Sequence, residues 1–411
     1  MKAVLSKSHT VERSPEILIG GSKSESNRLL ILQALFPSLQ INNLSNSDDT
    51  VLLQQALNSS SLIKDIHHAG TAMRFLTAYY ASQTGVEVLL TGSERMKERP
   101  IKILVDALGS LGAEISYAGK EGFPPLKITG KQLSGNYVEL DAGISSQFIS
   151  ALMLIAPSLK DGLRIKLKGE VTSKPYLEMT IALLNRCGIS AQISNNEISI
   201  AAANSIAAGT ISVESDWSSA SYFYSLIALS DKQSLTLRYF NPESRQGDSE
   251  VAAIYSQLGI TTSFDKSGQG ITLTQVPADI PDGLILDLSD TPDIAQTIAI
   301  SCFGLGIGCE LSGLHTLKIK ETDRLLALKT ELEKLGGSVQ VTANSLSLSP
   351  SVEFREDVTV ETYQDHRMAM AFAPLAQKVN IAVNDAGVVS KSFPEFWNRM
   401  SKAGLNVQIV R

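Results

Sequence analysis

The sequence contains little cysteine, histidine or tryptophan and has no excess of basic residues. Its three cysteines, Cys187, Cys302 and Cys309, are odd in number and form no CxxC pair, so neither a disulfide framework nor a zinc ribbon is supported. Five histidines without an HExxH motif predict that no metal is bound. Because 36 Lys and Arg stand against 42 Asp and Glu, for a net charge of −6, a general nucleic-acid binder is disfavoured.

Long hydrophobic runs are also missing. No stretch reaches the roughly 18 apolar residues of a membrane span, and the start, MKAVLSKSHTVERS, has no apolar signal-peptide core. The longest apolar stretches, residues 149–157 and 294–305, predict buried helices. We therefore expect a cytoplasmic protein in a reducing compartment. A composition of 43% hydrophobic and 19% charged residues excludes disorder, collagen and coiled coil, and 411 residues favour two or three domains.

One local pattern, an amphipathic helix, a glycine and a short alternating strand, occurs five times. Its closing glycines recur about every 70 residues, each where a helix needs a left-handed residue before a strand. A helix at 51–60 is a candidate sixth copy. The spacing predicts six α/β units in two halves, although helix–Gly–strand is common in any α/β protein. No Pro-rich or Ser-rich linker separates the halves, so we expect two lobes with a cleft between them. The five glycines are Gly112, Gly188, Gly259, Gly336 and Gly404.

The segment GGSKSESNR, residues 20–28, precedes an apolar helix. Small residues before a helix expose its first amide groups, which attract anions. Lys23 and Arg28 add full charges and Ser24 adds a hydroxyl, but the order does not match a P-loop. The alternative is an ordinary capped helix whose Lys and Arg face water.

Two basic segments follow, AGTAMR at 69–74 and RMKERP at 95–100. Pro100 is expected to begin a helix, which would place Arg99 at the positive end of the helix dipole, where an anion would relieve it. The alternative is a solvated basic turn.

Hydroxyl and amide donors gather before two further helices. Ser145, Ser146 and Gln147 open the first, and the turn SKPY from Ser173 to Tyr176 precedes the second. Such donors suit a phosphate or a polyol, whereas plain N-capping is the alternative.

Mixed acids and bases occur at 318–324 (KIKETDR) and 363–370 (YQDHRMAM). Lys320 and Arg324 are four residues apart and can converge on one ligand, and Glu321 between them can exchange a proton. The alternative is a salt-bridged helix start.

Together these segments resemble the enolpyruvyl transferase family, and within it the branch that acts on shikimate 3-phosphate. Each motif alone is weak, but ten in the family's order along nearly the whole chain are specific. They are GSKSESNR, AGTAMR, RMKERP, SSQF, SKPY, ESDWSSASYF, TPDIAQT, KIKETDR, TYQDHRMAMAF and KSFPEFW.

The resemblance implies a two-lobed α/β (α+β) fold with six βαβαββ repeats, three per lobe, and helix N-termini facing the cleft between the lobes. By analogy one lobe comprises residues 20–214. The other joins residues 1–19 to 215–411.

The implied reaction transfers the enolpyruvyl group of phosphoenolpyruvate to the 5-hydroxyl of shikimate 3-phosphate and releases phosphate, in aromatic amino acid biosynthesis. No metal or organic cofactor is implied, and a monomer is expected. Gly70 leaves room for the inhibitor glyphosate.

By position in the matched motifs, the resemblance assigns residues to each substrate and step. Asp293 is expected to accept the 5-hydroxyl proton and Glu321 to protonate C3 of phosphoenolpyruvate, with Lys23 and His366 assisting phosphate departure. The residues implied for shikimate 3-phosphate are Lys23, Ser24, Arg28, Ser145, Ser146, Gln147, Ser173, Tyr176, Asp293 and Lys320. Those implied for phosphoenolpyruvate are Lys23, Gly70, Thr71, Arg99, Gln147, Arg324, Arg367 and Lys391.

Three positions depart from the family pattern: His68 stands where Asn is usual, Phe75 where Pro is frequent, and Thr316 where Asn is frequent. They bear on substrate and glyphosate contacts, not on the reaction class. Two other classes of protein differ from this sequence at identifiable positions. The sister enzyme acting on UDP-N-acetylglucosamine uses a loop cysteine and a Lys-Asn pair, whereas Lys23 is followed by Ser24. A non-catalytic binding protein should have lost Asp293 or Glu321.

Overall fold

The computed structural model describes residues 1–7, 15–141, 143, 145–169, 174–206, 209–231, 234–265 and 269–410. The chain folds into two compact units. We call Gly21–Val213 the continuous unit, and Met1–Gly20 with Glu214–Arg411 the discontinuous unit. Each unit has its own hydrophobic core, as expected of separate domains. No helix in the described ranges is both long and apolar enough to cross a bilayer.

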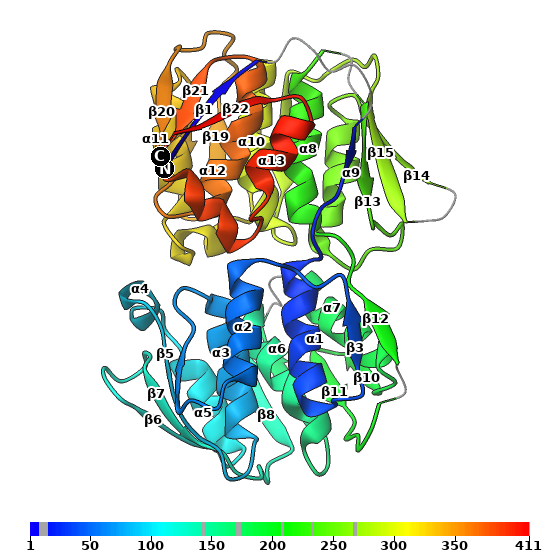
Figure 1. Cartoon of the computed structure of the whole chain (residues 1–411), viewed down its shortest axis with the longest axis vertical. Coiled ribbons are helices and arrows are strands. Elements are labelled where there is room, and N and C mark those ends of the chain that lie inside the picture. The colour runs from blue at the N-terminus through cyan, green and yellow to red at the C-terminus, as the bar shows by residue number, and fades with distance from the viewer. Residues whose placement is uncertain are drawn as a thin grey trace. The chain divides into compact units, whose positions relative to one another are not determined.

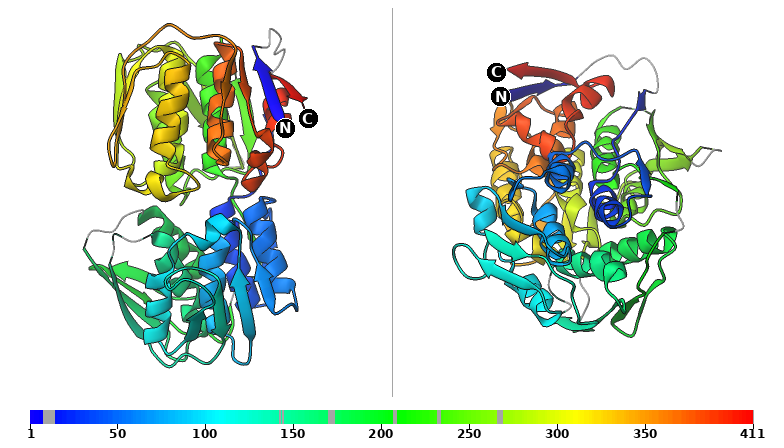
Figure 2. Two further views of the ribbon diagram at one scale, coloured as in Figure 1. Left: turned by 90° about the vertical axis from the view of Figure 1, so that its left-hand side faces the viewer. Right: turned by 60° about the horizontal axis from the view of Figure 1, so that its bottom comes forward.

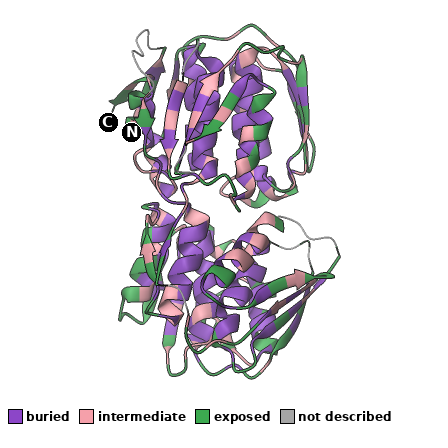
Figure 3. Ribbon diagram, turned by 90° about the vertical axis from the view of Figure 1, so that its right-hand side faces the viewer, coloured by how far each residue is buried: buried purple, intermediate pink, exposed green. Residues whose placement is uncertain are grey.

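The helices at the centre of each unit are buried on nearly all sides (Figure 3). In the continuous unit these are α3 (Gly70–Ala81) and α6 (Ser146–Ile155), and in the discontinuous unit α8 (Trp217–Leu229) and α10 (Ala295–Leu305). Such all-round apolarity is typical of a helix enclosed by other elements. The predicted burial of the two apolar stretches is confirmed, since α6 and α10 contain them.

One strand pattern is repeated in five four-stranded sheets of the described chain. In each sheet one pairing is parallel and the other two are antiparallel. The two parallel strands are consecutive strands connected by one α-helix in four of these sheets, whereas β2 and β13 are separated by the whole continuous unit. In β16 and β17, for example, the parallel register runs from Gly283 opposite Gly308 to Asp287 opposite Ser312. A helix-connected parallel pair places both strand-to-helix connections at the same sheet edge. This mixed α/β architecture confirms the predicted fold class.

The continuous unit contains two of these four-stranded sheets and the two-stranded sheet β12–β3 (Figure 1). Its remaining elements, in chain order, are α1 (Lys23–Leu35), β3 (Gln40–Asn42), α2 (Asp48–Asn58), β4 (Ile63–Asp65), β5 (Glu87–Thr91), α4 (Glu94–Lys97), α5 (Lys102–Ser110), β6 (Glu114–Tyr117), β7 (Leu126–Thr129), β8 (Tyr137–Asp141), η1 (Ala156–Ser158), β9 (Leu163–Lys168), α7 (Lys174–Arg186), β10 (Ala191–Ser194), β11 (Glu197–Ile200) and β12 (Thr210–Ser212).

The discontinuous unit contains the other three four-stranded sheets. In one of them β1 lies between β21 and β22, so the N- and C-terminal strands are neighbours (Figure 2). Its remaining elements are β1 (Lys2–Ser6), β2 (Glu16–Ile17), β13 (Ser234–Arg238), η2 (Gly247–Glu250), α9 (Val251–Ser256), β14 (Ile260–Phe264), β15 (Gly270–Gln275), β16 (Gly283–Asp287), η3 (Pro292–Ile294), β17 (Gly308–Ser312), η4 (His315–Ile319), α11 (Arg324–Lys334), β18 (Val339–Val341), β19 (Leu346–Leu348), β20 (Val358–Val360), α12 (His366–Phe372), η5 (Ala373–Gln377), β21 (Ile381–Val383), η6 (Ala386–Lys391), α13 (Phe396–Lys402) and β22 (Asn406–Val410).

The five predicted helix-ending glycines all have positive φ, between 77° and 107°, as a left-handed helix end requires. They follow α5, α7, α9, α11 and α13, the second helix of each four-stranded repeat. The candidate sixth copy is α2, which ends differently. It stops at an extended Ser59, and the next strand, β4, belongs to another sheet.

Candidate active site

Arg324 organises a buried ionic cluster in the discontinuous unit. Arg324 is 2% exposed. It is the first residue of α11, with Asp323 as the N-cap. Its Nε donates to Asp365 Oδ2 at 2.6 Å, Nη1 to Asp293 Oδ1 at 3.1 Å, and Nη2 to Glu321 Oε2 at 2.8 Å. One planar side chain thus fixes three carboxylates.

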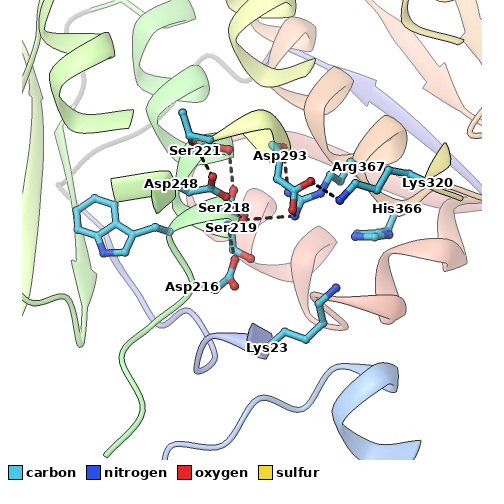
Figure 4. Close-up of polar contacts among 12 residues, drawn as sticks. Lys23, Asp216, Ser218, Ser219, Ser221, Asp248, Asp293, Lys320, His366 and Arg367 are labelled. Carbon is cyan, nitrogen blue, oxygen red and sulfur yellow. Dashed lines mark hydrogen bonds and ion pairs between the residues drawn. The ribbon is translucent and has the colours of Figure 1, made fainter. Parts of the chain in front are cut away.

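Three more cations contact the same carboxylates. Arg367 Nη2 donates to Asp293 Oδ2 at 2.9 Å, and Lys320 Nζ lies 3.6 Å from Asp293 Oδ1 (Figure 4). On the other side, Lys391 Nζ lies 3.1 Å from Glu321 Oε1. Four cations are thus gathered around these carboxylates, and such a concentration of basic side chains suits an anionic ligand.

The cluster shifts the pKa values of its own cations. Burial opposes the charge of Arg324, but Asp365, Glu321 and Asp293 together raise its pKa. For Lys320 the balance is reversed: Asp293 favours the charged form, yet burial and the nearby Arg324 lower the pKa overall. Lys320 therefore gives up its proton more readily than an ordinary lysine.

Asp365 joins the cluster to α12. Asp365 is the N-cap residue of that helix, and its side chain accepts a hydrogen bond from the Arg367 backbone amide at 2.9 Å. His366 beside it is 1% exposed, and its Nδ1 lies 3.8 Å from Asp365 Oδ1. Sequence reasoning missed Asp365, although an Asp immediately before a helix is a recognisable capping signal. It also missed Ser218 and Asp248, which are bonded to each other near Asp293 (Figure 4).

In the continuous unit, α1 carries the predicted anion-binding residues. Lys23 and Ser24 lie in its first turn after the N-cap Ser22, and Lys23 Nζ is 3.9 Å from Asp49 Oδ2. Arg28 is 2% exposed, so the alternative in which it faces water is wrong. Burial lowers its pKa to about 10.

The Arg28 guanidinium is surrounded by protein acceptors. Its Nε donates to Thr180 Oγ1 at 2.7 Å and its Nη2 to Ser150 Oγ at 3.0 Å. The Ser24 carbonyl accepts from Nη1 at 2.9 Å and the Tyr176 carbonyl from Nη2 at 3.4 Å. These bonds give Arg28 a structural role beside any role in binding a ligand.

Gly70 and Thr71 begin α3 beside a pair of arginines. A Cβ on Gly70 would lie 2.5 Å from Arg99 Nη1 and 2.9 Å from Arg74 Nη1, so two guanidinium groups approach this glycine. Arg74, which also donates to the Gly70 carbonyl at 2.8 Å, was missed by sequence reasoning. Two cations beside one helix start suit the binding of an anion.

The predicted helix start at Pro100 is wrong. The chain leaves α4 after Lys97, and α5 begins at Lys102 with Ile101 as its N-cap residue. Arg99 therefore lies in the connection between two helices rather than at a helix end. Its approach to Gly70 comes from tertiary packing and not from a helix dipole.

The serine-rich helix start shows the N-capping that was the alternative for this segment. Ser145 is the N-cap of α6 and accepts from the Gln147 amide at 3.4 Å, while Ser146 is the first helical residue. Gln147 Nε2 donates to Thr71 Oγ1 at 3.2 Å, so this start lies beside that of α3. Tyr176 lies in α7 near Arg28, and Ser173 lies outside the described residues.

The described residues thus hold two groups of predicted site residues, one in each unit. The discontinuous unit brings together Asp293, Lys320, Glu321, Arg324, Arg367 and Lys391, with His366 adjacent. The continuous unit brings Gly70, Thr71, Arg99 and Gln147 together. Within the described ranges, no three His, Cys, Asp or Glu side chains gather as a metal site would require.

Comparison of folds defines the class. The structure resembles two solved structures of EPSP synthase from Acinetobacter baumannii, each with a TM-score of 0.76 and 100% of both chains covered, at 19% and 18% sequence identity. At that identity the similarity establishes the fold alone, which is the fold of these two-lobed transferases.

Sequence comparison identifies the family. The profile of EPSP synthase (3-phosphoshikimate 1-carboxyvinyltransferase) matches residues 41–400. A protein named 3-phosphoshikimate 1-carboxyvinyltransferase from Bacteroides fragilis (strain YCH46) is 42% identical over 397 residues, 96% of each chain. Another of that name, from Shewanella pealeana, is 35% identical over 423 residues, 94% of this chain and 96% of its own. The chain belongs to the EPSP synthase family.

Proposed function

We propose that the chain transfers the enolpyruvyl group of phosphoenolpyruvate to the 5-hydroxyl of shikimate 3-phosphate and releases phosphate, in aromatic amino acid biosynthesis. Family membership supports this activity. The observation that carries the site assignment is Arg324, which holds Asp293 and Glu321 on the two ends of one guanidinium. Two carboxylates held beside four cations are what an acid–base step on a polyanion needs.

The addition step requires two proton transfers, and we assign one to each of these carboxylates. In the addition, C3 of phosphoenolpyruvate gains a proton and the 5-hydroxyl, as it loses its own proton, adds at C2. In the elimination, the tetrahedral intermediate loses a proton from C3 while its C–O bond to phosphate breaks, which restores the enol double bond and releases phosphate. We assign the hydroxyl proton to Asp293 and the C3 proton to Glu321. Each substrate carries a carboxylate and a phosphate of about −1.5 to −2 charges. Lys320 is assigned to shikimate 3-phosphate, and Arg324, Arg367 and Lys391 to phosphoenolpyruvate.

The contacts of Arg324 limit how it can take part. Protein carboxylates take four of its five N–H donors, so phosphoenolpyruvate must use the remaining Nη1 donor or compete with Glu321 and Asp293. His366 is assigned to phosphate departure. Because its side chain is buried, either the first turn of α12 must open to expose it or His366 must act through a neighbouring residue.

Residues of the continuous unit complete the assignment. Lys23 is proposed to contact both substrates and to assist phosphate departure. We assign Gly70, Thr71 and Arg99 to phosphoenolpyruvate, and Gln147 to both substrates. Shikimate 3-phosphate is assigned to Ser24, Arg28, Ser145, Ser146, Ser173 and Tyr176.

Three further properties belong to this proposal. Inhibition by glyphosate, a small anion, is supported by the two guanidinium groups that approach Gly70, and unchanged turnover in excess glyphosate would refute it. A cytoplasmic location is supported by three buried, unpaired cysteines. A monomer is expected, and light scattering at working concentration tests it.

The activity is tested by incubating the purified chain with both substrates and measuring released phosphate together with the mass of the product. Release that needs both substrates, with a product carrying the enolpyruvyl group, is expected. Transfer to UDP-N-acetylglucosamine instead would identify the sister activity. Binding of shikimate 3-phosphate without any phosphate release would indicate a non-catalytic binding protein.

A further inference from the structure

A buried carboxylate adjoins the cluster without contacting a cation directly. Asp248 lies in η2 and is 5% exposed. Among the residues that the structure describes, its two oxygens accept from hydroxyls only: Oδ2 from Ser218 Oγ, and Oδ1 from Thr291 Oγ1 at 2.6 Å. Burying a carboxylate with hydroxyl partners alone is costly. Burial and the nearby negative charge of Asp293 raise the pKa of Asp248 to about 6.

Each hydroxyl partner is one step from a residue of the proposed site. Ser218 Oγ accepts from Arg367 Nη2 at 3.4 Å while donating to Asp248. Thr291 lies two residues before Asp293, at the N-cap position of η3. Figure 4 shows Ser218 between Asp248 and Arg367. A hydroxyl that donates to a fixed carboxylate presents its lone pairs in a fixed direction.

We propose that Asp248 is a positioning residue for the enolpyruvyl transfer. Through Ser218 it orients the guanidinium of Arg367, and through Thr291 it holds the backbone segment that carries Asp293. Asp248 thus helps to position the Asp293 carboxylate in two ways, through its cationic partner Arg367 and through its backbone, without touching substrate. This inference rests on the proposed function of Asp293 and Arg367.

The proposal predicts a distinctive pH dependence. The charged groups facing Asp248 are Asp293 from η3 and Arg367 from α12. When ionised, Asp248 accepts from both hydroxyls. Once protonated, Asp248 must donate one hydrogen bond, so the direction of the bond with either Ser218 or Thr291 is reversed. Its pKa is raised above that of an ordinary carboxyl, so positioning is intact above pH about 6 and is lost as the pH falls through that value.

The test compares kcat and KM of the full chain and of Asp248→Asn between pH 5 and 8. Both substrates titrate in this range through their phosphates, so the informative quantity is the ratio of wild-type to variant rate, in which substrate ionisation cancels. We expect D248N to lower kcat about 10- to 100-fold at pH 8. The ratio should shrink about tenfold by pH 5, where Asp248 is protonated in the wild type as well. Binding of shikimate 3-phosphate should change little.

Glu214→Gln is the matched control. Glu214 is another carboxylate of the same unit with a pKa raised by burial, and it accepts from Trp217 Nε1 at 2.7 Å and Ser244 Oγ at 2.7 Å. E214Q should lower the thermal midpoint and leave the rate ratio independent of pH. A D248N ratio that is equally flat, or wild-type kinetics in D248N, would overturn the proposal.

Two further variants decide the matter if D248N does not fold. Ser218→Ala removes only the link to Arg367 and should raise KM for phosphoenolpyruvate. Thr291→Val removes only the link to Asp293's segment and should lower kcat. Wild-type values in both would overturn the proposal. The proposed function is tested separately, by measuring phosphate release from the wild-type chain before any variant. Absence of that release would refute the proposed function itself.

Discussion

Asp293→Asn removes one negative charge from the ionic cluster and keeps the shape of the side chain. In the wild type this carboxylate contacts Arg324 at 3.1 Å, Arg367 at 2.9 Å and Lys320 at 3.6 Å. The amide can still accept a hydrogen bond from one of these cations. It cannot take a proton from the 5-hydroxyl, so the variant separates base catalysis from packing.

Two effects of opposite sign determine the kinetics. Loss of a positioned base costs about 10²–10⁴ in kcat, or about 2.7–5.5 kcal/mol of barrier. The other effect favours binding, since a unit charge about 4 Å away at an effective dielectric constant of 20 is worth about 4 kcal/mol before relaxation. We therefore expect a much lower kcat with a KM for phosphoenolpyruvate that is unchanged or lower. Loss of one hydrogen bond should weaken shikimate 3-phosphate binding no more than about tenfold.

The pH profile gives a second readout. Asp293 is the group that most favours the charged form of Lys320, so D293N should lower the pKa of Lys320 further. Lys320 holds its charge below its pKa and loses it as the pH rises. The alkaline limb of the residual activity should therefore move to lower pH.

Steady-state phosphate release, with shikimate 3-phosphate affinity measured by calorimetry, checks these expectations. Asp287→Asn is the control, because Asp287 is an exposed carboxylate at the end of β16 whose side chain accepts from Ser289. It should behave as the wild type. A D293N enzyme with wild-type kcat, or one whose kcat falls only as far as its substrate binding, would refute the role of Asp293.

Glu321→Gln should likewise lower kcat by about 10²–10⁴ with shikimate 3-phosphate affinity retained, and wild-type turnover would remove its role as the acid. Gly70→Ala should fold, because the added Cβ meets only the ends of the Arg99 and Arg74 side chains. It should displace Arg99 and thereby raise KM for phosphoenolpyruvate at least about tenfold, equivalent to 1.4 kcal/mol. Gly109→Ala, a helix position with no neighbour within 4 Å, should leave KM unchanged and stabilise by about 0.5–1 kcal/mol. Arg28→Met should lower the free energy of unfolding by at least about 2 kcal/mol, since buried acceptors lose their donor. An unchanged melting temperature would contradict the structural role of Arg28.

Periodic features of the sequence predicted the repeats well, because they depend on local physics. The glycines after α5 and α11, for example, end their helices as any left-handed cap does. Burial of α6 and α10 followed from their apolar composition. The pairing of the short strands beside the boundary between the two units did not follow. β2 precedes α1 in the chain yet pairs with β13, and β12 precedes α8 yet pairs with β3. A two- or three-residue strand carries no information about which sheet it joins.

The site residues were predicted unevenly for a similar reason. Charged residues beside helix starts could be found from sequence, but their partners could not. Arg28 looked like a ligand or a solvated charge, and only tertiary packing brings Ser150 and Thr180 to it. Asp248 gave no signal at all, because its hydroxyl partners lie 30 and 43 residues away in the chain.

A single topological rule explains why such distant residues meet. In the β16–β17 and β20–β21 repeats of the discontinuous unit, two parallel strands each lead through a connection into a helical segment, and both connections emerge at the same edge of the sheet. The remaining repeat differs, because β13 leads into η2 and α9 whereas α8 follows β12, a strand of the continuous unit. Every one of these connections or helix starts supplies a group to the cluster or to its network. They hold, in chain order, Ser218, Asp248, Asp293, Lys320 with Glu321 and Arg324, Asp365 with Arg367, and Lys391. Without Asp248, the connection between β13 and α9 would contribute no group to the cluster. The topology therefore places Asp248 where it can support the catalytic residues.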